Sequence, residues 1–411
     1  MAHTRNSRTR ATPARPRAGQ RRPLSRGGSF FGRLLAVLLT CWLVVAAIVA
    51  PAVPGGWTAM ALAMVVLTGL PLAAFVRRQR RRETPGVLVR LFVYRPFWYA
   101  QLLVLLAGTA GIAGLLLGAP FGASGTVARW MVAGAASVYA LGVFAGWIGS
   151  RWLHVRRLTA SFPDLPSGLE GLRIVQLSDL HIGPQTSRRF LDRVRSAVAG
   201  AGGDLIAVTG DLVDDHALDS THYASALGAL TAPLGVYVVP GNHDVYANWP
   251  AVRAELARLP VTILVNESRV VQRGDASFAV AGTGDPAGRW IATSHAAPDI
   301  DAALRDVAPA TFTIALAHNP SLWPALADRG VDLTLSGHTH WGQLALPAFK
   351  WSLAGLFLDH AMGVVTRDAS LLYIHPGTGF WGIPFRIGAR PEVTIIELRR
   401  GAHVELGPVS G

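Results

Sequence analysis

The stretch "SGHTH", Ser336–His340, places two imidazole side chains one residue apart at the end of a short apolar run. That run, Val331–Leu335, predicts a buried strand that breaks into a loop where the stretch begins. Gly337 permits a sharp backbone turn at this point, so His338 and His340 can be directed toward one place. The stretch therefore predicts a functional site at the end of this strand, completed by side chains from elsewhere in the chain.

Other short apolar runs in the C-terminal part of the chain predict further buried strands. These runs cover residues 173–177, 205–208, 236–239, 312–316, 371–374 and 393–396. Helical spacing of apolar residues is found over residues 187–201, 249–259 and 299–306. This alternation favours an α/β or α+β domain in which helices flank central sheets.

Polar clusters follow nearly every predicted strand, where ligands bind to sheets of this kind. The candidate ligands in these clusters are Asp179, His181, Asp211, Asn242, His318, His338 and His340. Carboxylate oxygen and neutral imidazole nitrogen together suit Mn, Fe or Zn, whereas Mg or Ca would call for mainly oxygen. Only a carboxylate such as Asp211 has the charge and the two oxygens needed to bridge two cations. We therefore expect two divalent metal ions (Mn, Fe or Zn).

Each cluster by itself has an ordinary structural explanation. An Asp-x-His sequence such as Asp179–His181 is common by chance, and a Gly-Asp pair is usually a turn. A single histidine at a strand end, such as His318, is more often a hydrogen-bonded structural residue than a ligand. Five clusters in order, each at a predicted strand end, favour a metal site over these explanations.

The five clusters read "SDLHIG" (178–183), "TGDLVD" (209–214), "PGNHDVY" (240–246), "LAHNP" (316–320) and "SGHTHWGQ" (336–343). In this order they resemble the pattern of the calcineurin-like metallophosphoesterase superfamily. The likeness covers about residues 171–398, and the tail "PGTGFWGIPFRIGARPEVTIIEL" (376–398) is similar to the YkuE/YaeI-type membrane-associated branch. The resemblance implies a four-layer α/β sandwich that binds two metals.

The resemblance also implies a role for each matching residue. Asp179, His181 and His340 would hold one metal, Asn242, His318 and His338 would hold the other, and Asp211 would bridge the two. His243 would contact the phosphate and protonate the leaving group, and Asp244 would support it. Where relatives often have glycine after the last histidine, this chain has Trp341. We expect its ring to shape the rim of the pocket.

Charge is divided unevenly along the 411 residues. Residues 1–157 hold 20 arginines and one acidic residue, whereas residues 158–411 hold 18 Lys or Arg against 24 Asp or Glu. The basic residues are interleaved with long apolar spans, which membrane orientation explains better than binding of phosphate backbones. No nucleic-acid partner is expected. The single cysteine, Cys41, excludes an intrachain disulfide and a thiolate metal site.

Four charge-free spans, near 34–53, 57–76, 97–118 and 130–149, each have about the length that a helix needs to cross a bilayer. Nine arginines precede the first span, seven lie between the second and third, and residues 51–56 and 120–128, in the other two links, contain no charge. The positive-inside rule then places the C-terminal domain in the cytoplasm, on the inner side of the cell membrane. A twin-arginine export signal at Arg21–Arg22 is the competing interpretation, and three further spans count against it.

These observations predict a disordered basic N-terminus (1–33), four transmembrane helices (34–150), a linker (151–170) and a catalytic domain (171–411). The expected function is a membrane-anchored phosphoesterase that attacks a phosphodiester or pyrophosphate with metal-bridged hydroxide and uses His243 as general acid. A membrane sensor with the same fold and little turnover is the alternative, and a transporter is disfavoured because the spans carry no ionisable residue at mid-membrane depth.

The expected partners are the lipid bilayer and a phosphoester substrate, with a lipid phosphodiester or pyrophosphate as first choice. The apolar and aromatic stretch 344–364 bears on this choice. An ordinary packed insertion is the favoured interpretation of that stretch, and a loop that dips into the bilayer is the other.

Overall fold

The structure is a computed structural model that describes residues 26–81, 86–214, 216 and 227–408. Of the basic N-terminus predicted to be disordered, residues 1–25 lie outside the described residues, and a helix begins at Arg26.

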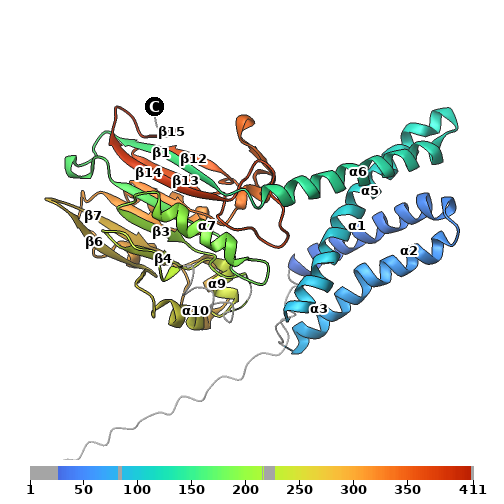
Figure 1. Ribbon diagram of the computed structural model, residues 1–411, viewed down its shortest axis with the longest axis horizontal. Helices are drawn as coiled ribbons and strands as arrows, with labels where there is room; N and C mark the ends of the chain where they lie inside the picture. The colour runs from blue at the N-terminus through green and yellow to red at the C-terminus, as the bar shows by residue number, and fades with distance from the viewer. Residues whose placement is uncertain (1–25, 82–85, 215, 217–226, 409–411) are drawn as a thin grey trace, which may run out of the picture. The chain divides into compact units, whose positions relative to one another are not determined.

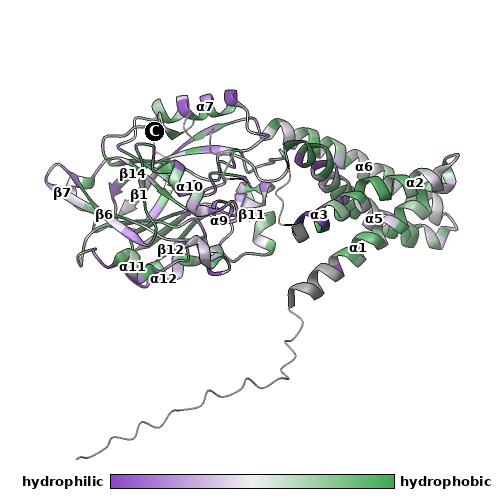
Figure 2. Ribbon diagram, turned by 90° about the horizontal axis from the view of Figure 1, so that it is seen from below, coloured by the Kyte–Doolittle hydropathy of each residue, from purple (hydrophilic) through white to green (hydrophobic). Residues whose placement is uncertain are grey.

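Within the described residues, four helical stretches are long and apolar enough to cross a membrane. They cover Leu35–Ala52, Gly56–Arg78, Val87–Phe121 and Ser124–Gly149. The main helices in them are α1 (Arg26–Val49), α2 (Gly56–Met64), α3 (Leu70–Arg81), α5 (Arg95–Gly118) and α6 (Ser124–Gly149). Their apolar character is visible along most of their length in Figure 2. The prediction of four apolar helices ahead of the catalytic domain is confirmed.

Small residues allow two of these helices to approach closely. A Cβ atom added to Gly108 of α5 would lie 2.6 Å from the Cβ of Cys41 in α1. Close approach at small residues is the usual way in which helices associate in lipid, where burial of apolar surface gives little driving force.

The C-terminal part of the chain contains two large mixed sheets (Figure 1). The first has seven strands in the order β15-β1-β14-β2-β3-β4-β5. Their bounds are β1 (His154–Phe162), β2 (Arg173–Leu177), β3 (Leu205–Thr209), β4 (Val236–Val239), β5 (Thr262–Ile263), β14 (Glu392–Arg400) and β15 (Glu405–Pro408). Strands β2 to β5 run parallel to one another, so their carboxyl ends lie at one edge of the sheet.

The second sheet has six strands in the order β12-β13-β9-β8-β7-β6. Their bounds are β6 (Glu267–Arg273), β7 (Ala276–Gly282), β8 (Thr313–Leu316), β9 (Leu333–Ser336), β12 (Gly363–Arg367) and β13 (Ser370–Ile374). The neighbouring strands β7, β8, β9 and β13 are parallel. A separate two-stranded ribbon pairs β10 (Ala345–Leu346) with β11 (Trp351–Ser352).

An apolar core lies between the two sheets and holds them packed face to face. It combines Ile174 of β2 and Ile396 of β14 with Phe278 of β7 and Ile314 of β8, all completely buried. Alternate residues of the same strands point the other way, because successive side chains of a strand lie on opposite faces. Val175, next to Ile174, thus belongs to a second core.

Helices cover the outer face of each sheet. Over the first sheet lie α7 (Arg188–Ala199), α9 (Asn242–Tyr246) and α10 (Trp249–Leu256). Over the second lie α11 (Ile300–Leu304) and α12 (Trp323–Ala327). The order helix, sheet, sheet, helix is the predicted four-layer α/β sandwich.

One predicted boundary differs from the structure. The segment 151–170, predicted to be a linker, contains strand β1, which pairs along its whole length with β14 in the first sheet. Its last residues are buried, and its first four include the half-buried Arg156 and the exposed Arg157. These charges interrupt the apolar pattern that marks the other buried strands.

Candidate metal centre

Five loops bring the predicted ligands to one edge shared by the two sheets. Asp179 and His181 follow β2, Asp211 follows β3, and Asn242 begins α9 directly after β4. From the second sheet, His318 follows β8, and His338 and His340 follow β9. Backbone hydrogen bonds join the loops: Asp179 donates to the Gly210 carbonyl at 2.9 Å, and Gly337 donates to the His318 carbonyl at 3.0 Å.

A first group of ligand atoms is formed by Asp179, His181 and His340, all of which are buried. The Nε2 atoms of His181 and His340 lie 2.9 Å apart. Asp179 Oδ1 is 3.3 Å from His340 Nε2. Three electron-pair donors thus point at one small volume.

A second group is formed by Asn242, His318 and His338. Asn242 Oδ1 lies 2.7 Å from His338 Nδ1 and 3.2 Å from His318 Nε2. The other nitrogen of His318, Nδ1, donates to the Thr209 carbonyl at 2.7 Å. That hydrogen bond fixes the ring and leaves Nε2 directed at Asn242.

Asp211 lies between the two groups. Its Oδ2 atom is 3.6 Å from His181 Nε2 in the first group and 3.2 Å from His318 Nε2 in the second. Its Oδ1 atom accepts a hydrogen bond from the His243 backbone amide at 2.8 Å. The carboxylate therefore reaches both groups with one oxygen.

The donor set fits divalent transition metals. Ligand atoms that share a metal at about 2.1 Å lie roughly 3.0 to 3.4 Å from one another, and the distances within both groups are close to this range. Four imidazoles supply neutral nitrogen, one amide supplies neutral oxygen and two carboxylates supply anionic oxygen, a set that suits Mn, Fe or Zn.

The backbone is held in an uncommon conformation at most of these ligands. Positive φ angles occur at Asp179 (51°), His181 (42°), Asp211 (51°), His338 (70°) and His340 (50°). Such angles are unfavourable for residues with a Cβ and concentrate at functional sites. They turn each side chain inward directly after its strand.

Glycines make room for this arrangement at two positions. A Cβ on Gly337 would lie 2.2 Å from Asp179 Oδ2, and one on Gly241 would lie 2.2 Å from Asp211 Oδ1. Both carboxylates are therefore packed directly against backbone. Any larger residue at either glycine would displace a candidate ligand.

His243 lies at the open side of the centre. Its ring centroid is 4.8 Å from that of His181, and its side chain is partly exposed. Its Nδ1 donates to the Asp214 carbonyl at 2.5 Å. That contact fixes the orientation of the ring beside the centre.

Asp244 differs in environment from His243. Its Oδ1 accepts hydrogen bonds from the amides of Leu212 (2.9 Å) and Val213 (3.1 Å), and its Oδ2 accepts one from Gly241 (2.9 Å). The completely buried carboxylate thus ties the loop after β3 to the loop after β4.

Burial keeps one histidine of each group in its neutral form. It lowers the pKa of His181 to about 3, with a further contribution from His243. Burial also lowers the pKa of His338, in the second group, to about 4. Both rings are therefore neutral at physiological pH, as metal ligation requires.

Asp211 and His318, unlike His181 and His338, both carry a charge. Burial disfavours both charges, but the attraction between the two outweighs it, so the pKa of Asp211 is held well below its usual range and that of His318 well above. Burial raises the pKa of Asp179 to about 6. A metal bound at His318 must therefore displace a proton.

Two residues near the centre were not predicted from the sequence. The Trp381 ring is half exposed and lies 5.9 Å from that of His243, and its backbone exchanges two hydrogen bonds with the Gln343 side chain. The buried Arg386 contacts His340 Nδ1 through Nη2 at 2.7 Å. Both belong to the tail stretch 376–398, whose likeness to the family was the only available signal.

Trp341 does not line the rim as predicted. It is 4% exposed, and its indole nitrogen donates to the Ile374 carbonyl at 2.9 Å. The ring packs with Ala345 and Ala389 in a small core. His375, which follows β13, is completely buried and accepts a hydrogen bond from the Gly377 amide.

The stretch 344–364 is not an ordinary packed insertion. Phe349 is 79% exposed and Phe357 is 80% exposed. Further exposed apolar residues of this stretch are Leu346, Trp351, Leu353, Leu356 and Leu358. We call these seven residues the apolar ridge. It is joined to the metal-ligand loop, since Leu353 donates to the Leu344 carbonyl at 2.8 Å.

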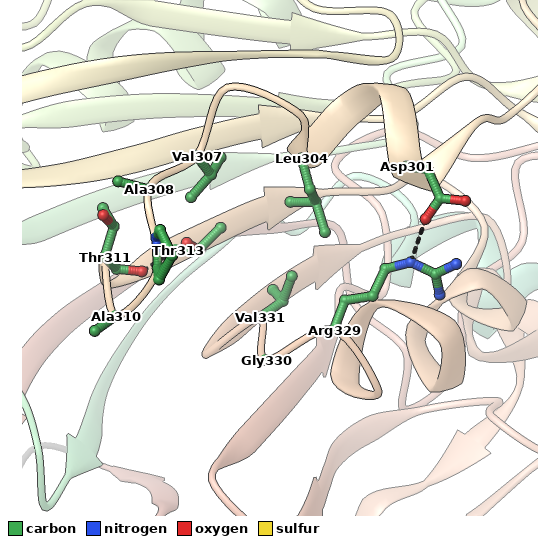
Figure 3. Close-up of a pocket in the computed structure, with 11 residues that line it drawn as sticks. Asp301, Leu304, Val307, Ala308, Ala310, Thr311, Thr313, Arg329, Gly330 and Val331 are labelled. Carbon is green, nitrogen blue, oxygen red and sulfur yellow. Dashed lines mark hydrogen bonds and ion pairs between the residues drawn. The ribbon is translucent and has the colours of Figure 1, made fainter.

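A pocket of about 350 Å³ lies elsewhere in the domain (Figure 3). Its lining comes from residues between Asp301 and Thr313 and from Arg329, Gly330 and Val331. An ion pair between Arg329 and Asp301, at 2.7 Å, lies at one end of the pocket. None of the predicted ligands lines it. Its chemistry, one exposed ion pair among small apolar groups, gives no reason to place the reaction there.

Residues 172–342 match the family model of the calcineurin-like phosphoesterases. This part of the chain is a calcineurin-like metallophosphoesterase domain. The matched region begins just before β2 and ends just after the last predicted ligand, so it contains all seven.

Curated relatives extend this finding. A transmembrane protein with metallophosphoesterase domain from Danio rerio is 34% identical over 244 residues, which is 57% of this chain and 55% of that protein. The metallophosphoesterase YkuE of Bacillus subtilis is 28% identical over 62% of this chain and 89% of that protein. A UDP-2,3-diacylglucosamine pyrophosphatase of Chlamydia muridarum is 27% identical over 62% of this chain and 92% of that protein.

The match thus spans about half the length of the Danio rerio protein. Together with the four apolar helices, the relatives support a membrane protein that carries a metallophosphoesterase domain.

Proposed function

We propose that this protein is a membrane-anchored phosphoesterase that uses two divalent metal ions, Mn, Fe or Zn. The observation that carries the proposal is the convergence of seven donor side chains from five loops into two adjacent groups joined by Asp211. Asp179, His181 and His340 would hold one metal, and Asn242, His318 and His338 the other. Such a pair of cations supplies a hydroxide at neutral pH and neutralises charge on the phosphoryl oxygens.

The protein's own residues orient the substrate around that pair. His243 stands beside both groups, with Nδ1 fixed by the Asp214 carbonyl. Its Nε2 can bind a phosphoryl oxygen and give a proton to the leaving oxygen, a role suited to imidazole near neutral pH. A leaving alkoxide or phosphate is thereby released in its protonated form.

Asp244 has a positioning role in this proposal. Its three backbone hydrogen bonds hold the turn that presents Asn242 and His243, and also the loop after Asp211. It supports His243 through the backbone in this way.

A lipid phosphodiester or pyrophosphate is the proposed substrate class. The apolar ridge projects from the same loop that carries His338 and His340, and Trp381 exposes a second apolar surface beside His243. Exposed apolar surface of this extent is characteristic of contact with lipid or another protein. The relative from Chlamydia muridarum is named for a pyrophosphatase activity on a diacylated sugar nucleotide, which agrees with this class.

The proposed location is the cell membrane with the catalytic domain on the cytoplasmic side. The support is the distribution of arginines, which are frequent before the first span and between the second and third and absent from residues 51–56 and 120–128 in the other two links.

A membrane sensor that binds a phosphoester without turnover is the second candidate. Such a module would have no need for His243, since binding requires only the metals. The presence of His243 with a fixed ring favours the enzyme.

The test is hydrolysis by the full-length chain in detergent micelles, loaded with Mn²⁺. Phosphomonoesters, soluble nucleotide diesters, phospholipids and lipid pyrophosphates are compared at equal concentration. Hydrolysis of a lipid substrate is expected. Turnover of soluble nucleotide esters alone would remove the lipid proposal, and binding without turnover of any class would favour the sensor.

A further inference from the structure

Arg386 is a buried arginine behind one of the proposed metal ligands. It is 1% exposed. Its Nη2 atom contacts His340 Nδ1 at 2.7 Å and also donates to the Gly379 carbonyl, while Nη1 donates to the carbonyls of Pro376 and Ala389. Because a guanidinium only donates, Nδ1 of His340 is the acceptor and Nε2 carries the ring's one proton, which a metal at Nε2 would displace. The Arg386 guanidinium lies where its charge would balance that of the ring left behind. The ring is thus held on the side opposite to the atom that faces Asp179.

The segment that Arg386 ties together is in direct contact with the metal centre. Gly379 donates its amide to the Asp179 carbonyl at 2.8 Å. A Cβ on Gly377 would lie 3.0 Å from His340 Nδ1 and 2.7 Å from Arg386 Nη2. Arg386 therefore fixes the position of His340 and, through Gly379, that of the loop that carries Asp179.

The backbone of Arg386 in turn packs on the last turns of helix α6. Its amide donates to the Gly146 carbonyl at 2.9 Å. A Cβ on Gly149 would lie 1.9 Å from the Arg386 carbonyl oxygen, so only glycine allows this approach. The Phe385 ring also lies close to Gly146, where a Cβ would be 2.3 Å from Cδ2.

We propose that Arg386 is a positioning residue for the metal centre and that the end of α6 belongs to its scaffold. The membrane-spanning helix then serves as more than a tether, because its last two turns determine where the Arg386 guanidinium meets His340. The inference rests on the proposed function in that it takes His340 as a metal ligand. Partners behind a ligand histidine orient the ring, and their loss typically weakens metal binding by about 10- to 100-fold.

The test measures Mn²⁺ binding to the full-length chain in detergent by equilibrium dialysis, with thermal unfolding in parallel. Arg386→Gln removes the guanidinium. Gly149→Ala leaves every polar group in place and adds one methyl group against the Arg386 carbonyl. Gly142→Ala is the matched control on the same helix, since a Cβ at Gly142 has nothing within 4 Å. Alanine favours helix over glycine, so a defect from Gly149→Ala cannot come from helix propensity.

The expected result is that Arg386→Gln and Gly149→Ala each weaken one of two Mn²⁺ equivalents by about 10- to 100-fold, while Gly142→Ala binds like wild type. If Arg386→Gln does not fold, Gly149→Ala still decides the question. Wild-type affinity for both equivalents in Gly149→Ala would overturn the role of α6, and the same result in folded Arg386→Gln would overturn the role of Arg386. Failure of the wild type to bind two equivalents would instead contradict the proposed function.

Discussion

Replacement of Asp211 by asparagine is the sharpest chemical perturbation of the metal centre. The substitution keeps the shape of the side chain and an oxygen that can accept from the His243 amide, which is now bound at 2.8 Å. It removes one negative charge and replaces the second oxygen by an amide NH₂ group. That oxygen is the atom that lies 3.6 Å from His181 and 3.2 Å from His318, and an NH₂ group cannot ligate a cation.

The size of the effect follows from the lost charge. One unit charge about 4 Å from another is worth about 4 kcal/mol at an effective dielectric constant of about 20. Since 1.4 kcal/mol corresponds to a factor of ten, metal affinity should fall by about three orders of magnitude at the weaker position. We expect Asp211→Asn to lose one equivalent of metal and its phosphoesterase turnover.

The assay is metal content by mass spectrometry after dialysis of the full-length chain against micromolar Mn²⁺. Asp301→Asn is the matched control, because Asp301 is an exposed carboxylate in an ion pair with Arg329 and lies outside the candidate ligand set. Full occupancy in Asp211→Asn with unchanged affinity would refute the bridging role of Asp211.

The remaining predictions concern the acid, protonation, the apolar ridge and stability. His243→Ala should keep both metals and lose about 10²- to 10⁴-fold in turnover; loss of a metal equivalent by mass spectrometry would show that it is a ligand instead. Mn²⁺ affinity should fall as pH drops from 8 to 5, because the His318 pKa lies well above its usual value and the Asp179 pKa is about 6, so both take up protons in competition with the metal; affinity independent of pH in dialysis would contradict this. Phe357→Ser should lower hydrolysis of lipid in micelles and spare a soluble ester, whereas Val270→Ser, an exposed position on β6, should affect neither; equal loss on both substrates would argue against lipid contact. Trp341→Gly should lower the free energy of unfolding by about 2 to 4 kcal/mol, since loss of the buried ring costs about 3 to 5 kcal/mol and relief of its positive φ returns about 1 kcal/mol; a chemical denaturation curve at least as stable as wild type would show that backbone strain dominates.

The seven candidate ligands could be found from the sequence because each follows a strand with a clear local pattern. A run such as Leu205–Val208 is apolar on both faces, as buried parallel strands are. The residues directly after it then fall at the sheet edge without any knowledge of distant contacts. The two sheets and their flanking helices follow from the same pattern.

Strand β1 and Arg386 could not be found in this way. The exposed first half of β1 carries Arg156 and Arg157, and its partner β14 lies more than 200 residues further along the chain, so pairing is visible only in the fold. An arginine in a tail segment is ordinarily a surface residue. Its burial depends on three backbone carbonyls and on the end of α6, none of which leaves a local signal.

Trp341 shows the reverse problem. Because Trp341 directly follows His340 in the sequence, its ring was expected at the rim of the pocket beside the ligands. A positive φ of 52° turns the ring away from His340 and into the core formed with Ala345 and Ala389. The side chains of two adjacent residues with positive φ, here His340 and Trp341, point in different directions. The sequence alone does not show which residues have a positive φ.

Anomalous X-ray scattering from crystals of the Mn-loaded protein, collected at the manganese edge, tests the metal centre most directly. The account predicts two peaks about 3.5 to 4 Å apart, with Asp211 between them. A single peak, or peaks away from these seven side chains, would contradict it.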